Sequence, residues 1–357
     1  MRKALYKRGA RLCLILLVIA VVLWPVVASL DDPRGAFFTF VLGPFNDMRH
    51  FGNVLEATTP LLFTGLAVVI MFKAGAFNLG AEGAFFLGGV VATAVLLKLP
   101  LAGPLLPVVA IVAGGVIGAS VCVVPAWLKA SVGASELVCS LMLNYAALFI
   151  GLYIVNYHLR DPNAGAMLSY RIPLDGKLPR ILAGTRVHLG LVIGLLGCAL
   201  GAVYLYKTRW GYESRLVGSN PLFARHVGVR TVLVGLIAPC VGGFIAAAGG
   251  AVEIEGMYSR FSWTDLPGLG WNGLVVAILA NNNPAFVPVA AVFLAYLEVG
   301  GDLLAQNFAV PAEVVGVIKA LIILFSTMSI AVGNPRIKQL LVRVMPGARK
   351  LNTEVEP

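Results

Sequence analysis

Apolar runs long enough to cross a membrane recur along most of this chain, and they constrain its fold more than any other feature. A helix needs roughly 20 mainly apolar residues to span the hydrocarbon core of a bilayer. Because only helices and closed barrels satisfy their backbone groups in lipid, we predict an all-α polytopic membrane protein with about ten transmembrane helices. The predicted spans lie at about 11–30, 54–73, 82–98, 104–128, 136–156, 187–206, 231–252, 269–282, 284–301 and 312–332.

The composition favours a membrane protein over a soluble one. Of the 357 residues, 59% are hydrophobic and only 12% are charged, about half of the charged share of soluble proteins. The 40 glycines suit membrane helices, whose backbones approach closely at small residues. The net charge of +10 comes from residues between apolar runs. We therefore assign it to anionic lipid and membrane orientation, and expect no nucleic-acid partner.

Lysine and arginine also predict the orientation. Residues 11–30 are interpreted as a retained first helix rather than a signal peptide, because no clear small-residue cleavage site precedes Asp31. Five basic residues precede that helix, and five more follow the last span. The positive-inside rule then places both termini in the cytoplasm. The basic loop 157–186, which falls outside in this arrangement, is the one segment that opposes it.

We predict one transmembrane domain over residues 1–335, followed by a cytoplasmic tail at 336–357. The outer loop 157–186 is rich in Pro, Gly and Arg, and either contacts an external partner or only connects two spans. The inner loop 207–230 is amphipathic and basic. Asn220-Pro221 indicates a helix start there and Gly228 a helix stop. This loop is either a docking site for a soluble partner or a helix lying on the membrane surface.

Polar residues interrupt the apolar sequence between Phe77 and Gly83, which reads FNLGAEG. The pattern predicts a broken helix, with Asn78 capping the following helix and Glu82 near its positive N-terminus. Broken helices occur in membranes where they line a cavity or are buried in protein. Phe77, Asn78 and Glu82 are thus candidates for a substrate pathway, or structural residues at the cytoplasmic interface.

Two further polar groups lie within predicted spans. Glu136, Ser140 and Asn144 are spaced by four residues, so they share one helix face, which should point into the bundle. They line a pathway or tie helices together. Trp271 and Asn272 begin the eighth span. Trp271 would stack on a ring-bearing substrate or anchor the helix at the interface, and Asn272 would act as a cap.

Signs of enzymatic chemistry or of a metal site are absent from the sequence. The chain contains no GxxxxGK[ST] element, so it is not expected to bind ATP itself, and it contains no HExxH or GxSxG element. Its five cysteines lie in apolar runs without CxxC spacing, and its four histidines are scattered. Glu298 and Lys319 would form a structural pair, and they are the only support for an ion-coupled secondary transporter.

Four motifs in the same order resemble the permease subunits of bacterial ABC importers, the superfamily that includes ribose and branched-chain amino-acid permeases. Residues 77–83 resemble the FN[IL]GxEG element of nucleoside-type permeases, where ribose-type relatives carry a different element. Glu136 with the Met-Leu-Asn-Tyr stretch 142–145 resembles a second element. Residues 215–228 resemble the cytoplasmic loop, and residues 271–279 resemble a fourth element. The resemblance covers nearly all of residues 50–330.

The resemblance implies a multi-pass subunit of the bacterial inner (plasma) membrane. It would form a pathway for a nucleoside or related small solute, with a simple sugar as the alternative. The implied partners are a second permease chain, cytoplasmic ATPases that bind the ATP, and an extracytoplasmic substrate-binding protein. The residues implied in ATPase coupling are Arg215, Gly218, Asn220, Pro221, Ala224 and Gly228. Arg225-His226 and Asn272 depart from the family pattern, and the second departure leaves the substrate open.

Overall fold

The computed structural model describes residues 32–101, 103–308 and 310–332, and these residues are almost entirely helical. Within them no β-strand forms, apart from two isolated bridges in the loop between α6 and α7. The longer helices are α2 (Pro33–Asn46), α3 (Met48–Lys73), α4 (Ala81–Lys98), α5 (Leu105–Val132), α6 (Glu136–Ile154), α7 (Gly190–Lys207), α10 (Thr231–Met257), α12 (Val287–Phe308) and α13 (Ala312–Val332). Three short helices are α8 (Arg209–Ser219), α9 (Pro221–His226) and α11 (Leu269–Leu279).

Seven helices of the described residues are long and apolar enough to cross a membrane. They are α3, α4, α5, α6 with the π-helical turn Val155–Leu159 that continues it, α7, α10, and α12 with the short turn Pro284–Phe286. Each contains most of a predicted span, and α13 has the bounds of the predicted span 312–332. The predicted span 11–30 lies outside the described residues.

Several predicted boundaries were wrong. α3 begins at Met48 instead of 54, α5 continues to Val132, α10 to Met257 and α12 to Phe308. A hydropathy criterion stops at the first polar residues, whereas a helix continues while its backbone hydrogen bonds do. The segment 269–282 gives only the 11-residue helix α11, and α2 was not predicted.

Contacts divide the chain into two compact units, one of which comprises Pro44–Val299. The other comprises the remaining residues, and in its described part the end of α12 packs against α13, with Gly301 beside Val315. The first unit contains α3 to α11, and it carries all the predicted site residues.

Helices α4, α5 and α10 pack closely at the centre of the larger unit through small residues. A Cβ atom added at Gly250 of α10 would overlap the carbonyl oxygen of Phe85 in α4. One added at Gly88 of α4 would overlap the backbone of Ala247 in α10. Gly118 of α5 lies against Gly243 and Ala247 in the same way. Small residues let backbones approach in lipid, where association relies on van der Waals contact.

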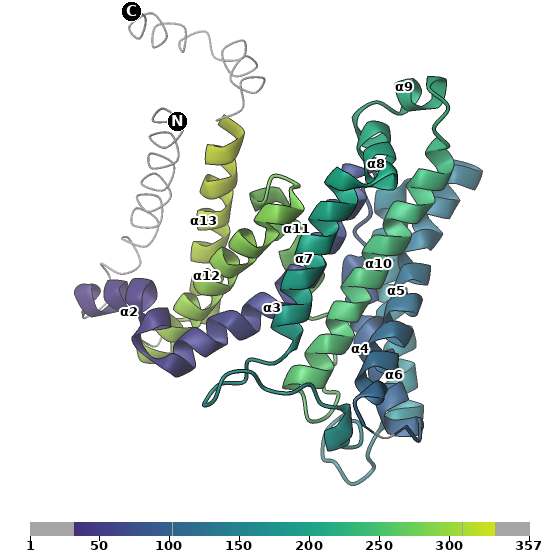
Figure 1. Ribbon diagram of the computed structural model, residues 1–357. Helices are drawn as coiled ribbons and strands as arrows, with labels where there is room; N and C mark the ends of the chain where they lie inside the picture. The colour runs from purple at the N-terminus through teal and green to yellow at the C-terminus, as the bar shows by residue number, and fades with distance from the viewer. Residues whose placement is uncertain (1–31, 102, 309, 333–357) are drawn as a thin grey trace, which may run out of the picture. The chain divides into compact units, whose positions relative to one another are not determined.

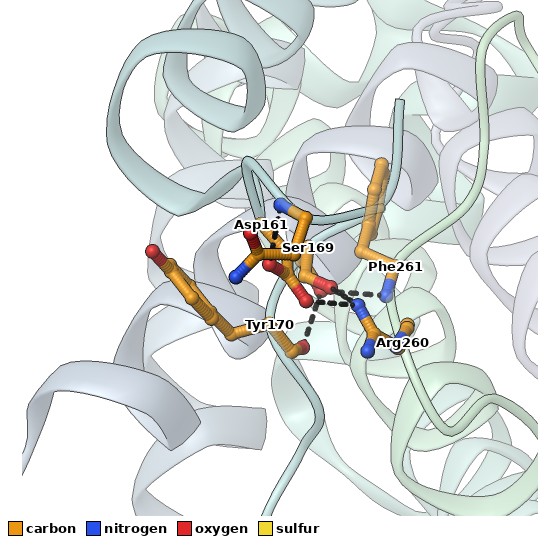
Figure 2. A network of polar contacts seen from close by, with 6 residues as sticks. Asp161, Ser169, Tyr170, Arg260 and Phe261 are labelled. Atoms are coloured by element: carbon orange, nitrogen blue, oxygen red, sulfur yellow. Dashed lines mark hydrogen bonds and ion pairs between the residues drawn. The ribbon is translucent and has the colours of Figure 1, made fainter. Parts of the chain in front are cut away.

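Helices α8 and α9 lie at one end of α7 and α10, as Figure 1 shows, and we call this the α8 end of the bundle. The loop between α6 and α7 lies at the opposite end. An ionic network joins this loop to the segment after α10 (Figure 2): Arg260 donates to the carboxylate of Asp161 at 2.7 Å and to the carbonyl of Ser169 at 3.1 Å. Hydrogen bonding to Arg260 lowers the pKa of Asp161. The loop predicted at 157–186 is therefore attached to the segment after α10 by an ion pair and hydrogen bonds.

Candidate functional site

Two helices of the larger unit begin inside the bundle rather than at its ends. Residues 74–80 lead from the α8 end to the start of α4, and residues 258–268 lead from the opposite end to the start of α11. Gly83 lies against Asn144, which is about 12 Å along α6 from its first residue. Gly273 lies against Thr64, about 14 Å from the end of α3. Both helices therefore start at a similar depth.

The carboxylate of Glu82 joins these two helix starts. It accepts hydrogen bonds from the backbone N–H groups of Gly268 at 2.6 Å, Gly270 at 2.5 Å and Trp271 at 3.1 Å. These donors belong to the first turn of α11, whose N-terminal N–H groups have no partner within the helix. The negative charge also complements the positive end of the helix dipole. Glu82 is 1% exposed, so its carboxylate is committed to holding α11 on α4.

The break before α4 is held by side chains from two neighbouring helices. Asn78 donates to the carbonyl of Cys122 in α5 at 2.7 Å and accepts from the N–H of Gly80 at 2.9 Å. Gly80, not Asn78, occupies the N-cap position of α4, so the predicted capping role was wrong. The reason is local: the side-chain oxygen of Asn78 closes a turn with the N–H of Gly80, and its amide nitrogen donates to α5.

The predicted polar face of α6 is confirmed as a buried face. Ser140 accepts from the N–H of Leu79 at 3.0 Å, and Asn144 donates to the carbonyl of Leu79 at 3.0 Å. Asn144 also accepts from the N–H of Gly83 at 2.9 Å. Glu136 pairs with Lys129 at 2.8 Å near the α8 end. The polar side chains of α6 therefore satisfy the backbone that the break leaves unpaired.

The predicted pathway residues fall into two groups. Those that are buried and hydrogen-bonded are Asn78, Glu82, Glu136, Ser140 and Asn144. The others face outward: Phe77 is 62% exposed, Trp271 is 45% exposed and Asn272 is partly exposed. Asn272 does not cap α11, because Gly268 with φ of 78° holds that position. A pathway role for any of them stays a prediction.

Helices α8 and α9 form a knob at one end of the bundle. Thr208 caps α8 through the N–H of Gly211, and Asn220 caps α9 through the N–H of Phe223 at 3.0 Å. Pro221 occupies the first turn of α9, and Gly228 follows it with φ of 85°. The helix start and stop predicted for this loop are thereby confirmed.

The knob packs directly on the turn that precedes the break. Gly218 of α8 lies against the carbonyl of Lys73, and the Cα of Gly218 would be 3.1 Å from a Cβ at Gly75. A small apolar cluster joins the knob to this turn and to α10. Its members are Ala74, Val217, Ala224, Val234 and Ala238. Arg215 stacks on the ring of Tyr206 at 5.2 Å. The predicted coupling residues therefore either fix the knob to the bundle or shape its helices.

His188 is a buried residue at the end of the bundle opposite the α8 end, and the sequence pattern did not single it out. Its side chain is 0% exposed, and its Nδ1 accepts from the N–H of Gly190 at 3.2 Å. Burial, with a smaller contribution from the charge of Lys177, lowers the pKa of His188 to about 4. Protonation at Nδ1 would also break the bond from Gly190. The imidazole is therefore neutral in the folded loop.

A pH dependence of the loop follows from this low pKa. Above pH 6.5 the imidazole is neutral both in the folded loop and in an opened one, so protonation of His188 does not favour opening and the folded loop has its full stability. Between pH 6.5 and 4 only the opened loop takes up a proton, so stability falls. From pH 7 to pH 5 we expect loop opening to become easier by about 2 kcal/mol, roughly 25-fold. Hydrogen exchange of residues 177–190, corrected for intrinsic rates, measures this. A His188→Gln variant should lose the dependence, and an unchanged dependence would contradict the assignment.

Sequence reasoning missed the partners of Glu82 and the network around Arg260. The Gly268-Leu-Gly270 pattern before α11 was the available signal, since glycines allow a close approach of backbone to a carboxylate. A Cβ at Gly270 would lie 2.5 Å from the backbone of Glu82. Nothing local relates Arg260 to Asp161, which is 99 residues away.

Comparison with known proteins gives consistent matches over most of the chain. The family described as "Branched-chain amino acid transport system / permease component" matches residues 51–327. The glucose ABC transporter permease protein TsgB13 of Haloferax volcanii is 34% identical, over 84% of this chain and 82% of its own. The guanosine ABC transporter permease protein NupP of Bacillus subtilis is 31% identical, over 81% and 84%. The nucleoside ABC transporter permease protein NupB of Lactococcus lactis is 28% identical, over 82% and 83%.

Proposed function

Because this chain belongs to the branched-chain amino acid transport permease family, we propose that it forms part of the translocation pathway of an ABC importer for nucleosides. Membership makes it a permease subunit of an ABC importer, a multi-pass protein of the inner membrane and not an enzyme. Membership in this family also excludes the alternative of an ion-coupled secondary transporter. The substrate, the partners and the topology are the parts that we propose.

We propose ten spans with both termini in the cytoplasm. The seven long apolar helices, together with α11, α13 and the apolar run 11–30, supply them. In this topology the α8 end is cytoplasmic and the loop between α6 and α7 is extracytoplasmic. The starts of α4 and α11 then lie near the membrane midplane, where discontinuous helices form binding sites in other transporters.

The sequence 77–83 is the observation that carries the nucleoside assignment, because it matches the nucleoside-type element. Two of the relatives, 31% and 28% identical, are named for guanosine and nucleoside transport. A simple sugar is the second candidate, favoured by the 34% identical glucose permease. Separate uptake assays of the assembled importer with labelled guanosine and with labelled glucose distinguish the two candidates. Uptake of glucose without uptake of guanosine would favour the sugar.

Cytoplasmic ATPase subunits are the proposed partners of the knob, and they would bind the ATP that the importer uses. Several apolar side chains of α8 and α9 lie exposed beyond the membrane spans, among them Trp210 at 65%, Leu222 at 70% and Phe223 at 53%. Arg225 and His226 are exposed beside them. An exposed apolar patch with a polar rim is typical of a protein interface.

The knob is also connected through direct contacts to the starts of α4 and α11. Gly218 contacts Lys73 and Gly75, residues 76–80 continue to α4, and Glu82 holds α11. We propose that ATPase movement reaches the start of α11 through these contacts, so that ATP binding biases two arrangements of the pathway. The second permease chain and a substrate-binding protein, docking at the loop between α6 and α7, would complete the importer.

Leu222→Asp is expected to weaken ATPase association at least tenfold, since it places a charge among the exposed apolar side chains of α9. Co-purification of the ATPase subunits with the permease measures this. Leu174→Asp is the matched control, because Leu174 is 88% exposed at the opposite end of the bundle. It should leave ATPase association unchanged. Unchanged ATPase association in Leu222→Asp would contradict docking at the knob.

A further inference from the structure

One face of α6 carries an exposed series of large side chains at helical spacing. Its members are Met142, Tyr145, Phe149, Tyr153 and Tyr157, the last in the π-helical turn. All five are more than half exposed, at 70%, 61%, 67%, 58% and 70%. We call this set the aromatic stripe. It lies on the side of α6 away from Ser140 and Asn144, which are buried against the break before α4.

The exposed faces of α5 and α7 have a different composition. The exposed residues along the membrane part of α5 are mainly aliphatic: Val108, Val112, Val116, Ile117 and Val124. Those along α7 are Val192, Leu195, Leu196, Leu200 and Val203. Their aromatic residues, Trp127 and Tyr206, lie near the α8 end, as expected at a membrane interface. Faces of this kind suit lipid, and the aromatic stripe does not.

The depth of the tyrosines argues against contact with acyl chains. Tyr145 lies about 14 Å along α6 and Tyr153 about 26 Å, within a span of about 36 Å. A hydroxyl group without a hydrogen-bond partner is costly in hydrocarbon. Tyrosine is enriched at membrane interfaces, where one end of the side chain is wet. Tyr145 therefore requires a polar occupant or water at its face, whereas Tyr153 lies six residues from the end of the span, near a membrane interface.

We propose that the aromatic stripe lines the translocation pathway and stacks on the heterocyclic base of the transported nucleoside. The inference rests on the proposed function and adds the residues that recognise the base. A nucleoside offers an apolar planar face and polar edges, which match rings and phenol hydroxyls on one surface. Stacking on successive aromatic residues tolerates different bases, because every base has a π-face. The hydrogen bonds of Ser140 and Asn144 hold α6 in register, so the Tyr145 end of the stripe is held at the level where α4 and α11 begin.

Uptake by the complete importer in proteoliposomes tests the stripe, with labelled guanosine as the probe. Tyr145→Leu should raise the KM for guanosine about tenfold or more, as expected for loss of one stacking partner. Tyr145→Phe keeps the ring and should raise KM less. Trp127→Leu is the matched control, because it removes an exposed aromatic ring from the lipid-facing side of α5 and should leave KM unchanged. Co-purification of the second permease chain with each variant is measured in parallel.

Each other outcome overturns the inference in a recognisable way. Loss of the second permease chain from Tyr145→Leu, with KM unchanged in the remaining complex, would make the stripe a subunit interface. Unchanged KM and unchanged assembly would make it a lipid face. In both cases the proposed function would stand, because the wild-type importer would still take up guanosine. A wild-type importer without guanosine uptake would overturn the proposed function and this inference together.

Discussion

Glu82→Ala is expected to lower the yield of folded protein and solute uptake together, each by at least tenfold. The change leaves the N–H groups of Gly268, Gly270 and Trp271 without their acceptor. Each buried donor left unsatisfied costs about 1–3 kcal/mol, so the total should reach about 3 kcal/mol or more. The yield of folded, detergent-solubilised protein and the total solute uptake measure the two effects, and thermal melting measures the loss of stability.

Two further variants separate the role of the carboxylate from a general effect of mutation. Glu82→Gln keeps one acceptor oxygen but turns an amide toward backbone donors, so it should rescue only partly. Glu213→Ala removes an acid that pairs with Arg209 on the surface of α8, and it should cost less than about 0.5 kcal/mol. A Glu82→Ala protein that melts normally yet transports nothing would contradict the structural role. It would place the carboxylate in the pathway itself.

Gly250→Leu is expected to prevent assembly of the central three helices. A side chain at this position would overlap the carbonyl of Phe85, a backbone atom that cannot move without displacing α4. Overpacking a core costs about 1–3 kcal/mol when side chains yield, and here the backbone must shift, so we expect the folded protein to be lost. Size-exclusion chromatography of the solubilised protein is a sufficient measurement.

The matched control for this prediction lies on the same helix. A Cβ at Gly235 of α10 meets nothing within 4 Å, so Gly235→Leu should give a folded protein. Both changes improve helix propensity equally, and they differ only in what the new side chain meets. If both variants fold, the close approach of α4 and α10 is not required for assembly.

Much of the fold could be predicted from local patterns. Apolar length indicated the membrane helices, because a bilayer of fixed thickness demands it. The spacing of Glu136, Ser140 and Asn144 indicated a buried face, and all three are buried. Asn220-Pro221 and Gly228 indicated a short helix, which is α9. Each of these signals depends only on residues within one turn or one helix, so the local sequence is sufficient to predict the feature.

The candidate site was only partly predictable. The break at residues 77–83 was visible, but not the partners that stabilise it. Glu82 binds donors that are 186 to 189 residues further along the chain, and Asn78 binds a carbonyl 44 residues away. The aromatic stripe also escaped prediction, because Tyr145 next to Asn144 gives no sign of which side of α6 is covered.

By itself the sequence determined that this chain is a helical membrane protein, where most of its spans lie, and that one span is interrupted near Glu82. Only the tertiary structure decided that the interruption before α4 meets the start of α11, and that the polar residues of the break bind backbone rather than face outward. The physical reason is that hydropathy and capping depend on neighbours in the chain. The partner of a buried carboxylate is decided by which backbone donors the packed helices bring within hydrogen-bonding distance.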